Sequence, residues 1–382
     1  MKKYVNWLAY ILLAIAFIIG TSHSSDKKRN EVSQLEYLLK DKLLLNELES
    51  ETYSVQKHDS LIGYLAMGEA QGYGGPLSIA VIADTKGIIK TVELINNFES
   101  ASFLAKLSNE KYYAQYPGKE VNNRFIIKED LDAVSGATVS SVAIANAVRA
   151  ASFKIAETNL NIEIPNIEKS FRFTPKEGIA LLLFVLGVIT VFLRKKKLRY
   201  LSLFLGLIFM GFLFNASLSI THIGRIILGY FPDIYTHFIW WLLMAGTITI
   251  IIGWGRNVYC STLCPFYATQ VLLNKVSGIN LKLPPKVSKV LIKTPNVLLW
   301  LSLVLIFLSS NPTIASYEPF ALLFSLEGAG IQWYILPASL IGALFFSNFF
   351  CRFFCPVGAT FRWIQKKRKQ VITVFTNTKQ QS

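Results

Sequence analysis

Residues 257–269 read NVYCSTLCPFYAT, and residues 348–360 read NFFCRFFCPVGAT. Both stretches follow one pattern, Asn-x2-Cys-x3-Cys-Pro-x2-Ala-Thr, at a constant offset of 91 residues (348 − 257). Each copy comes at the end of a long apolar segment, so we expect two helical halves of the same orientation, related by a pseudo-two-fold axis along a membrane normal. Such an axis brings together the four cysteines of the chain: Cys260, Cys264, Cys351 and Cys355.

The four cysteines are candidate metal ligands. Two cysteines at positions i and i+4 share one face of a helical turn, and the proline that follows exposes backbone donors. Four thiolates suit a [2Fe–2S] cluster, a [4Fe–4S] cluster or structural zinc, and spacing alone does not choose among them. Free cysteines are also often plain buried apolar side chains. The repeated motif, with no cysteine elsewhere in the chain, favours the metal site.

Lipid is the expected solvent for part of the chain, because 52% of its residues are hydrophobic and 27 are phenylalanine. Segments with few or no charges are long enough, or nearly so, to cross a hydrocarbon core of about 30 Å. The six segments are 4–25, 178–193, 200–223, 234–255, 294–317 and 328–351. The sequence therefore predicts an all-α polytopic membrane domain, with about six transmembrane helices in the whole chain.

The formal charge of +15 is unevenly distributed, which argues against a nucleic-acid-binding protein. Residues 24–177 carry 18 basic and 21 acidic residues, a balance of −3, whereas the rest of the chain carries 21 and 3, a balance of +18. Loops 221–235 and 310–329 together hold one Arg and three acids, so the basic surplus lies on the other side of the membrane. The positive-inside rule then places both termini and both Cys-x3-Cys-Pro motifs in the cytoplasm of a bacterial inner membrane, and residues 24–177 outside it.

The order of regions along the chain follows from these patterns. We expect a membrane anchor at 1–25, favoured over a cleaved signal peptide, and an amphipathic helical stalk at 26–54 whose apolar periodicity covers 30–51. An extracytoplasmic α+β domain at 55–160 has strands at 61–67, 77–83 and 88–95, a hairpin turn at 84–87, and helices at about 101–113 and 138–156. A linker at 161–177, a membrane domain with five helices at 178–365 and a basic cytoplasmic tail at 366–382 follow.

The stretch 132–141, DAVSGATVSS, precedes the last helix of the α+β domain. Small residues let a phosphate approach the backbone amides of a helix N-terminus, where the helix dipole favours an anion. A Ser or Thr hydroxyl at that point is able to carry such a phosphate as an ester. From the residues alone, an ordinary helix cap explains the same pattern.

Two family resemblances sharpen these expectations. The paired Cys-x3-Cys-Pro motifs resemble those of the NosR/NapH family of membrane iron–sulfur proteins, over roughly residues 200–365. The stretch Asp-x2-Ser-Gly-Ala-Thr resembles the attachment motif of the FMN-binding domain shared by NqrC, RnfG and NosR, over roughly residues 55–157. Together they resemble a NosR/NirI-like membrane flavo-iron–sulfur protein of the short, PceC-like form, which lacks a ferredoxin-like tail.

The FMN-binding resemblance implies a set of cofactor residues. Thr138 is the position that a flavin transferase esterifies with the phosphate of FMN, and a segment before a strand, 72–77, also matches the family. Glu99 stands where the family often has a His-x-Glu-Thr-like segment, and the match there is incomplete. The further residues expected around FMN are Asp132, Ser135, Gly136, Ala137, Gly74 and Gly75.

The expected role is electron transfer, as a component of an oxidoreductase system in anaerobic respiration. Quinol from the membrane pool, or a cytoplasmic ferredoxin-like donor, would supply electrons through the iron–sulfur site and covalent FMN to an extracytoplasmic reductase. The two cofactors are expected on opposite sides of a core about 30 Å thick, so an intermediate carrier is needed. Quinone is the favoured candidate, near His222 and His237 at the outer ends of two spans, and haem ligated by these histidines is the alternative. An interfacial His is commonly an ordinary loop residue.

A redox-sensing regulatory protein, or an assembly protein with zinc or reactive thiols at the four cysteines, is the competing interpretation. Finding flavin together with iron would exclude the zinc-bearing assembly protein. Reduction of FMN by quinol would favour electron transfer.

Overall fold

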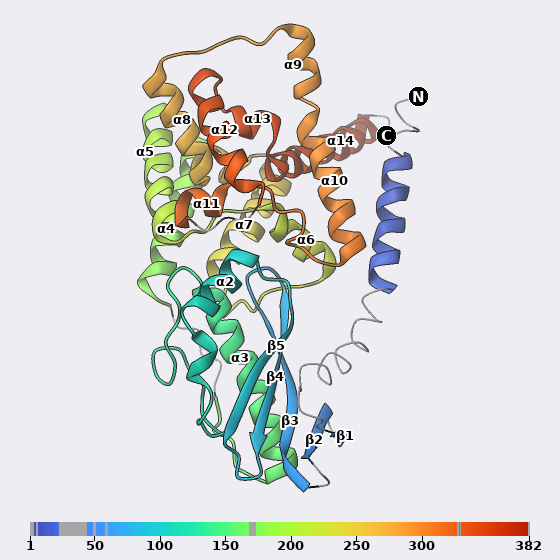
Figure 1. Ribbon diagram of the computed structural model, residues 1–382. Helices are drawn as coiled ribbons and strands as arrows, with labels where there is room; N and C mark the ends of the chain where they lie inside the picture. The colour runs from blue at the N-terminus through green and yellow to red at the C-terminus, as the bar shows by residue number, and fades with distance from the viewer. Residues whose placement is uncertain are drawn as a thin grey trace. The chain divides into compact units, whose positions relative to one another are not determined.

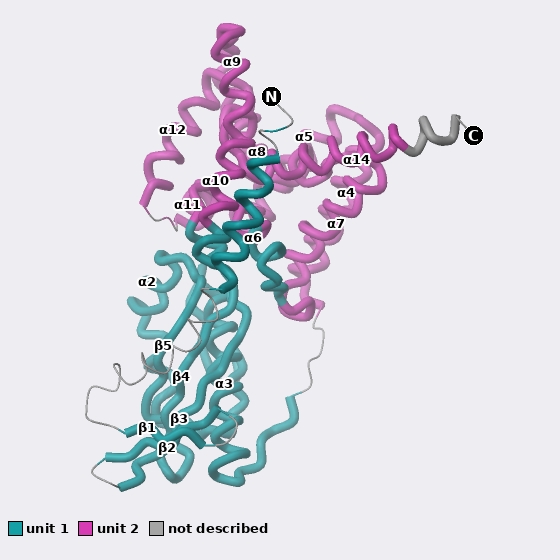
Figure 2. Tube along the Cα trace, turned by 90° about the vertical axis from the view of Figure 1, so that its right-hand side faces the viewer, with its two compact units in different colours: residues 1–169, 224–232, 306–314 teal, residues 170–223, 233–305, 315–382 magenta. Residues whose placement is uncertain are grey.

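The computed structural model describes residues 4, 7–22, 44–48, 51–57, 60–167, 173–326, 328 and 330–380. The chain divides into two compact units (Figure 2). Unit 1 consists of residues 1–169 together with the short segments 224–232 and 306–314. Unit 2 consists of residues 170–223, 233–305 and 315–382.

Unit 1 is built on an antiparallel sheet of five strands in sequential order, β1-β2-β3-β4-β5 (Figure 1). The strands are β1 (Leu44–Glu47), β2 (Thr52–Lys57), β3 (Ser60–Gln71), β4 (Pro76–Asp84) and β5 (Ile89–Asn97). After the sheet come α2 (Ala101–Asn109), a 3-10 helix (Tyr112–Gln115), α3 (Thr138–Ile155) and a π-helical turn (Ala156–Leu160). The N-terminal helix Trp7–Ser22 also belongs to this unit.

Helix α3 covers one face of the sheet and packs against β3 and β4 (Figure 1). Side chains alternate along β4 because successive residues of a strand point to opposite faces. Leu77, Ile79 and Val81 are buried on the face that meets the alanine-rich side of α3. Ala80 belongs to a smaller cluster on the opposite face, with Val55. Strand β4 therefore has buried apolar side chains on both of its faces.

The strands and helices expected in 55–160 are confirmed in type and position, although the helix expected at 101–113 ends at Asn109. The helical stalk expected at 26–54 is wrong in its last part, because Leu44–Glu47 and the residues from Thr52 onward are strands. Pairing of β1 with β2, which joins Leu45 to Val55, overrides the local helical periodicity. Residues 30–43 lie outside the described residues.

Unit 2 is helical. Its helices, including two that run on into unit 1, are α4 (Pro175–Leu193), α5 (Lys196–Leu205), α6 (Ile220–Leu228), α7 (Phe238–Trp254), α8 (Pro265–Ser277), α9 (Pro285–Leu291), α10 (Thr294–Ser309), α11 (Phe320–Ser325), α12 (Gln332–Phe345), α13 (Phe349–Phe353) and α14 (Pro356–Gln380). Two π-helical segments, Gly206–Leu213 and Tyr259–Leu263, extend α5 and precede α8. Helix α14 extends through the basic tail that was expected to begin at residue 366, as far as Gln380.

Two helices of the described chain are long and apolar enough to cross a membrane: Pro175–Leu193 and the continuous stretch Pro285–Ser309. Three shorter apolar helices fall within other expected spans: Trp7–Ser22, Phe238–Trp254 and Gln332–Phe345. The span expected at 200–223 is not one helix. It is helical to Leu213 and resumes at Ile220, with Asn215 in a left-handed conformation (φ 46°) between them.

Side chains from distant segments accept the hydrogen bonds of backbone amides at that break. The hydroxyl of Tyr259 accepts a hydrogen bond from the Leu218 amide at 2.8 Å, and a carboxylate oxygen of the buried Glu318 accepts one from the Ile220 amide at 2.6 Å. A helix can be interrupted inside an apolar region only where such partners replace its own hydrogen bonds.

Candidate functional sites

Thr138 is the first residue of α3 and is exposed to solvent. The turn before it contains Gly136 at φ 80°, a left-handed conformation that glycine adopts without strain. The Ser141 hydroxyl donates to the Ala137 carbonyl at 3.0 Å and accepts from the Val134 amide at 3.2 Å, which fixes this turn. The first amides of a helix have no partner within the helix, so a phosphate on Thr138 would meet donors there.

Glu99 is buried beside this turn. It contacts Ser140 of α3, which is two residues after Thr138. The hydroxyl of Ser140 donates to its carboxylate at 2.5 Å, and the amide of Gly74 donates to the other carboxylate oxygen at 3.2 Å. The incomplete motif match at Glu99 therefore falls on a residue that ties the glycine-containing loop, residues 72–75, to the first turn of α3.

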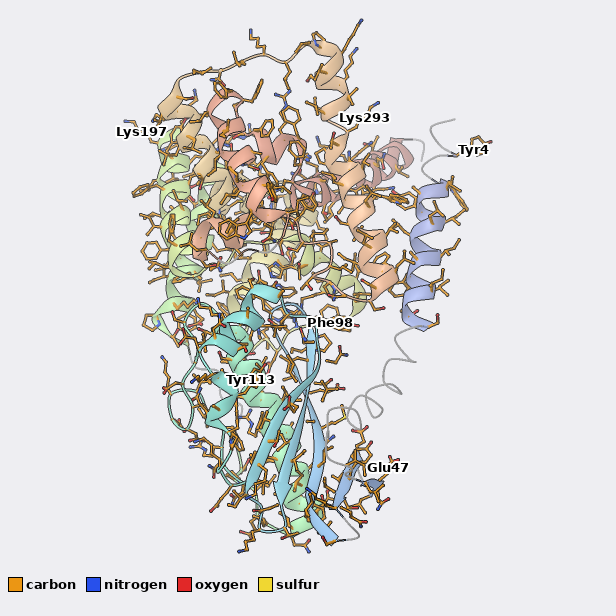
Figure 3. The ribbon with its side chains drawn as sticks, in the orientation of Figure 1. Tyr4, Glu47, Phe98, Tyr113, Lys197 and Lys293 are labelled. Atoms are coloured by element: carbon orange, nitrogen blue, oxygen red, sulfur yellow. The ribbon has the colours of Figure 1, made fainter. Side chains whose placement is uncertain are left out.

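The glycines of this loop are required by packing within the protein. A Cβ atom on Gly72 would lie 2.0 Å from the Glu99 carboxylate, and one on Gly74 would lie 1.7 Å from the Phe98 carbonyl oxygen. A Cβ on Gly75 would lie 2.9 Å from the Phe98 ring. Figure 3 places Phe98 at one end of the sheet of unit 1 and Glu47 at the other. The glycines thus allow the loop to close over Phe98 and Glu99.

Arg225, on the 224–232 segment of unit 1, holds the same loop from its carbonyl side. Its Nη1 donates to the carbonyls of Gly72 at 2.9 Å and Tyr73 at 2.6 Å, and its Nε donates to the Tyr230 carbonyl at 3.3 Å. Its side chain is almost completely buried, with 1% exposed. Tyr230 in turn stacks on Phe98, with ring centroids 5.6 Å apart.

Burial shifts the two charged groups of this cluster in opposite directions. Loss of hydration raises the pKa of Glu99, while hydrogen bonds from Ser140 and the loop amides, and the charge of Arg225, work against that rise. Loss of hydration lowers the pKa of Arg225 to about 10, and the carboxylate of Glu99 opposes the change. Arg225 remains charged near neutral pH, so the loop lies between a buried cation and a buried acid.

Replacing Arg225 with methionine should destabilise unit 1 strongly. Arg225→Met leaves two buried carbonyls without donors and Glu99 without its cation, a change that typically costs about 3–5 kcal/mol. Thermal unfolding of the full-length protein, followed by circular dichroism, should show a clearly lower midpoint temperature for this variant.

The matched control is Arg124→Met. Arg124 pairs with Glu129 at 3.1 Å on the surface, and such exposed pairs are worth about 0–1 kcal/mol. If the two variants unfolded at the same temperature, the hydrogen bonds of Arg225 would not contribute to the stability of unit 1.

The four cysteines line one cavity of about 370 Å³ within unit 2. The expectation that the two motifs come together is therefore met. The cavity is also lined by Tyr259, Tyr267, Phe320, Arg352 and Arg362. Positive side chains beside four sulfurs offset the negative charge that four thiolates would bring.

Within each motif the two cysteines lie on either side of a helix break, so the expectation that they share one helical turn is wrong. Cys260 lies in the π-helical turn Tyr259–Leu263, whereas Cys264 caps the N-terminus of α8 with ψ 116°. Proline excludes the helical conformation from the residue before it, which explains the break. The freed donors face sulfur, as expected: the Gly358 amide donates to Cys355 Sγ at 3.3 Å.

Four cysteine thiols that line one cavity form a donor set that fits an iron–sulfur cluster, and four thiolates also suit structural zinc. In the described part of the chain, no group of three or more His, Cys, Asp or Glu residues is arranged to hold a metal ion.

Neither expected quinone residue is among the described residues that line this cavity. Nδ1 of the buried His222 accepts a hydrogen bond from the Ser219 amide at 3.1 Å, and its ring meets Trp240 edge-on at 6.2 Å. His237 caps α7 and lies with its Nδ1 2.8 Å from the Thr236 hydroxyl. These contacts are those of ordinary structural histidines, and a quinone at either one stays a prediction.

Sequence reasoning missed several residues of the two sites. Arg225 stood out only as the one basic residue of the two outer loops 221–235 and 310–329, and its contact with Gly72 spans 153 residues of chain. Ser140 and Gln270, both fully buried polar residues, contact Glu99 and Cys351 respectively. Polar residues within apolar helical stretches were the available signal.

Comparison with known families assigns a different cofactor domain to each region. Residues 72–152 match the FMN-binding domain family. Residues 236–284 and 334–373 match the 4Fe-4S binding domain family. The first match contains Glu99 and Thr138, and the second contains all four cysteines.

Several curated proteins are similar to parts of the chain. "Regulatory protein NosR" of Pseudomonas aeruginosa is 28% identical over 199 residues, which is 45% of this chain and 27% of that protein. "Protein NirI" of Paracoccus denitrificans is 26% identical over 208 residues, 47% of this chain and 30% of that protein. One component of the proton-translocating ferredoxin:NAD(+) oxidoreductase complex of Clostridium ljungdahlii is 23% identical over 148 residues, 37% of this chain and 80% of that component. The aligned part of this chain spans about a third or less of the NosR and NirI relatives.

Proposed function

Because the chain is a NosR-like flavo-iron–sulfur protein, we propose that it relays electrons through a membrane, from a cytoplasmic or quinol donor to an extracytoplasmic reductase of anaerobic respiration. One observation carries the proposal: a single chain presents an exposed hydroxyl at the N-terminus of α3 and a cavity lined by four thiols. Flavin supplies one- or two-electron chemistry and an iron–sulfur cluster supplies one-electron chemistry, so the pair suits a relay.

At the flavin site, each residue has a distinct task. The Thr138 hydroxyl carries the FMN phosphate as an ester, added by a flavin transferase. Ser135, Gly136 and Ala137 form the turn that leaves the first amides of α3 open to that phosphate. Asp132 lies at the start of this turn, where its amide donates to Gln115 Oε1 at 2.8 Å.

At the four-thiol site, the residues supply ligands and charge. The four cysteine thiolates hold the cluster, and the first turns of α8 and α14 direct backbone amides toward two of them. Arg352 and Arg362 lie along the wall and lower the electrostatic cost of adding an electron. A second cavity of about 380 Å³ shares Tyr267, Ser347 and Asn348 with the first.

That second cavity suggests where a protein donor docks. Arg199 and Lys275 line it, and none of its described lining residues is acidic. Lys197 and Lys293 lie at one end of unit 2 (Figure 3). A small acidic carrier of the ferredoxin type is the complementary cytoplasmic partner, because opposite charge speeds encounter and orients the docked protein. Membrane quinol is the alternative donor.

Membrane topology follows the charge pattern. We propose six spans, with both termini and the four cysteines on the cytoplasmic side and the FMN-binding domain outside. Supporting this, the segments 224–232 and 306–314, which overlap the two loops that carry few basic residues, are grouped with the FMN-binding domain in unit 1. The hydrogen bond from Arg225 to the Gly72 carbonyl supports placing the 224–232 segment on the same side as that domain.

Anaerobic flavin reduction in the purified full-length protein tests this function. We expect a reduced acidic ferredoxin, or a quinol, to bleach the flavin absorbance of the wild type. Cys264→Ser should slow the reaction with the acidic donor by at least about tenfold. Replacing a residue that only hydrogen-bonds to a metal ligand already lowers metal affinity or activity by about 10–100-fold, and Cys264 is a proposed ligand. High salt should slow docking of the acidic donor but not reaction with quinol.

The outcomes distinguish the two donors and also test the electron-relay function itself. Reduction by quinol alone would identify the membrane pool as the donor. If neither donor reduced the flavin of a protein that holds both cofactors, the relay would be contradicted. A regulatory role is the second candidate, because two relatives are named "Regulatory protein NosR", and it would then be favoured.

A further inference from the structure

Gln270, on α8, is a fully buried polar side chain next to the four-thiol cavity. Its Nε2 donates to Cys351 Sγ at 3.0 Å and to the Phe266 carbonyl at 3.4 Å. Its Oε1 accepts from the Phe350 amide at 2.8 Å. The side chain of Gln270 therefore has a partner for both of its N–H donors and for its oxygen.

These contacts determine which end of the amide faces the sulfur. A backbone N–H can only donate, so the group facing the Phe350 amide must be the oxygen. The NH₂ group of Gln270 then has to point toward Cys351, and the assignment does not depend on an arbitrary choice between amide oxygen and nitrogen.

The sequence repeat shows that this contact is specific to one half of the site. With the offset of 91 residues, Gln270 corresponds to Phe361, which is also fully buried. Backbone contacts repeat in both halves: the Gly358 amide faces Cys355 and the Tyr267 amide faces Cys264. The side-chain amide does not repeat, so Cys351 alone receives it from this position.

We propose that Gln270 raises the reduction potential of the iron–sulfur cluster by donating a hydrogen bond to the ligand sulfur of Cys351. The inference rests on the proposed cluster. One-electron reduction adds negative charge that is shared by the ligand sulfurs, and an N–H donor stabilises the more negative state more. Removing the donor therefore favours the oxidised state and lowers the potential.

The test compares Gln270→Met and Gln270→Leu with the wild type in redox titrations of the full-length protein, followed by the electron paramagnetic resonance signal of the cluster. Methionine is flexible enough to fill the same space, and both residues lack an N–H donor. We expect the ratio of oxidised to reduced cluster at a fixed potential to rise roughly tenfold, which corresponds to a decrease of about 59 mV for a one-electron couple.

Thr269→Val is the matched control on the same helix, because the Thr269 hydroxyl donates only to the Pro265 carbonyl at 3.1 Å. Its cluster potential should equal that of the wild type. The flavin of each sample is an internal reference and should titrate as in the wild type.

Three results would count against the proposal. An unchanged or raised cluster potential in both Gln270 variants would overturn the tuning role while leaving the cluster in place. A shift of the same size in Thr269→Val would show a general effect of altering α8. A wild-type protein without any cluster signal would overturn the iron–sulfur site itself, and the tuning role with it.

Discussion

Thr138→Val should abolish covalent flavin. Valine has nearly the shape of threonine but no hydroxyl, so no phosphoester can form, while the turn before α3 and the Ser140–Glu99 contact remain intact. The full-length protein, produced together with a flavin transferase and separated on a denaturing gel, should show flavin fluorescence in the wild type and none in this variant.

Thr138→Ser is the control, because serine keeps a hydroxyl at the same position. We expect it to retain fluorescence, at a level set by how well the transferase accepts serine. Fluorescence that persisted in Thr138→Val would place the attachment on another residue. A dark wild type with an active transferase would contradict covalent FMN altogether.

Cys264→Ser should remove most of the cluster. The serine hydroxyl is a poor replacement for a thiolate at iron, and Cys264 also links the cavity to the N-terminus of α8. Replacing a residue that only hydrogen-bonds to a metal ligand typically lowers metal affinity by about 10–100-fold. Loss of a ligand itself should therefore lower the iron content per chain by at least about tenfold.

Ser261→Ala is the matched control within the same motif. The hydroxyl of Ser261 donates to the Asn257 carbonyl at 2.5 Å, and Ser261 is not among the described residues of the cavity wall. Its iron content should stay at the wild-type level while Cys264→Ser loses iron. Equal iron in both variants would exclude Cys264 as a ligand.

Local sequence patterns predicted the parts of the fold that depend on local contacts. Two strand-like apolar stretches joined by a hairpin turn identified β4 and β5, and small residues before a helix rich in Ala and Val located the start of α3 at Thr138. The repeat predicted that four cysteines far apart in the sequence meet, because a shared orientation can be read from sequence alone.

Features that depend on distant partners were not predictable in this way. Strand β1 forms because it pairs with β2, although it lies within the stretch 30–51 whose apolar residues have helical spacing. The break before Ile220 exists because Tyr259 and Glu318 supply hydrogen bonds from elsewhere in the chain. For the same reason Arg225, whose partners lie about 150 residues earlier in the chain, could not be assigned to the flavin-binding unit.

The cofactor composition of the wild-type protein, purified from membranes, is the most direct test of the account. We predict flavin bound to the polypeptide, together with iron and acid-labile sulfide in equal amounts, as expected for a [4Fe–4S] cluster. Zinc without sulfide in a chain that carries no flavin would contradict it, and would instead support a structural metal site in a protein that transfers no electrons.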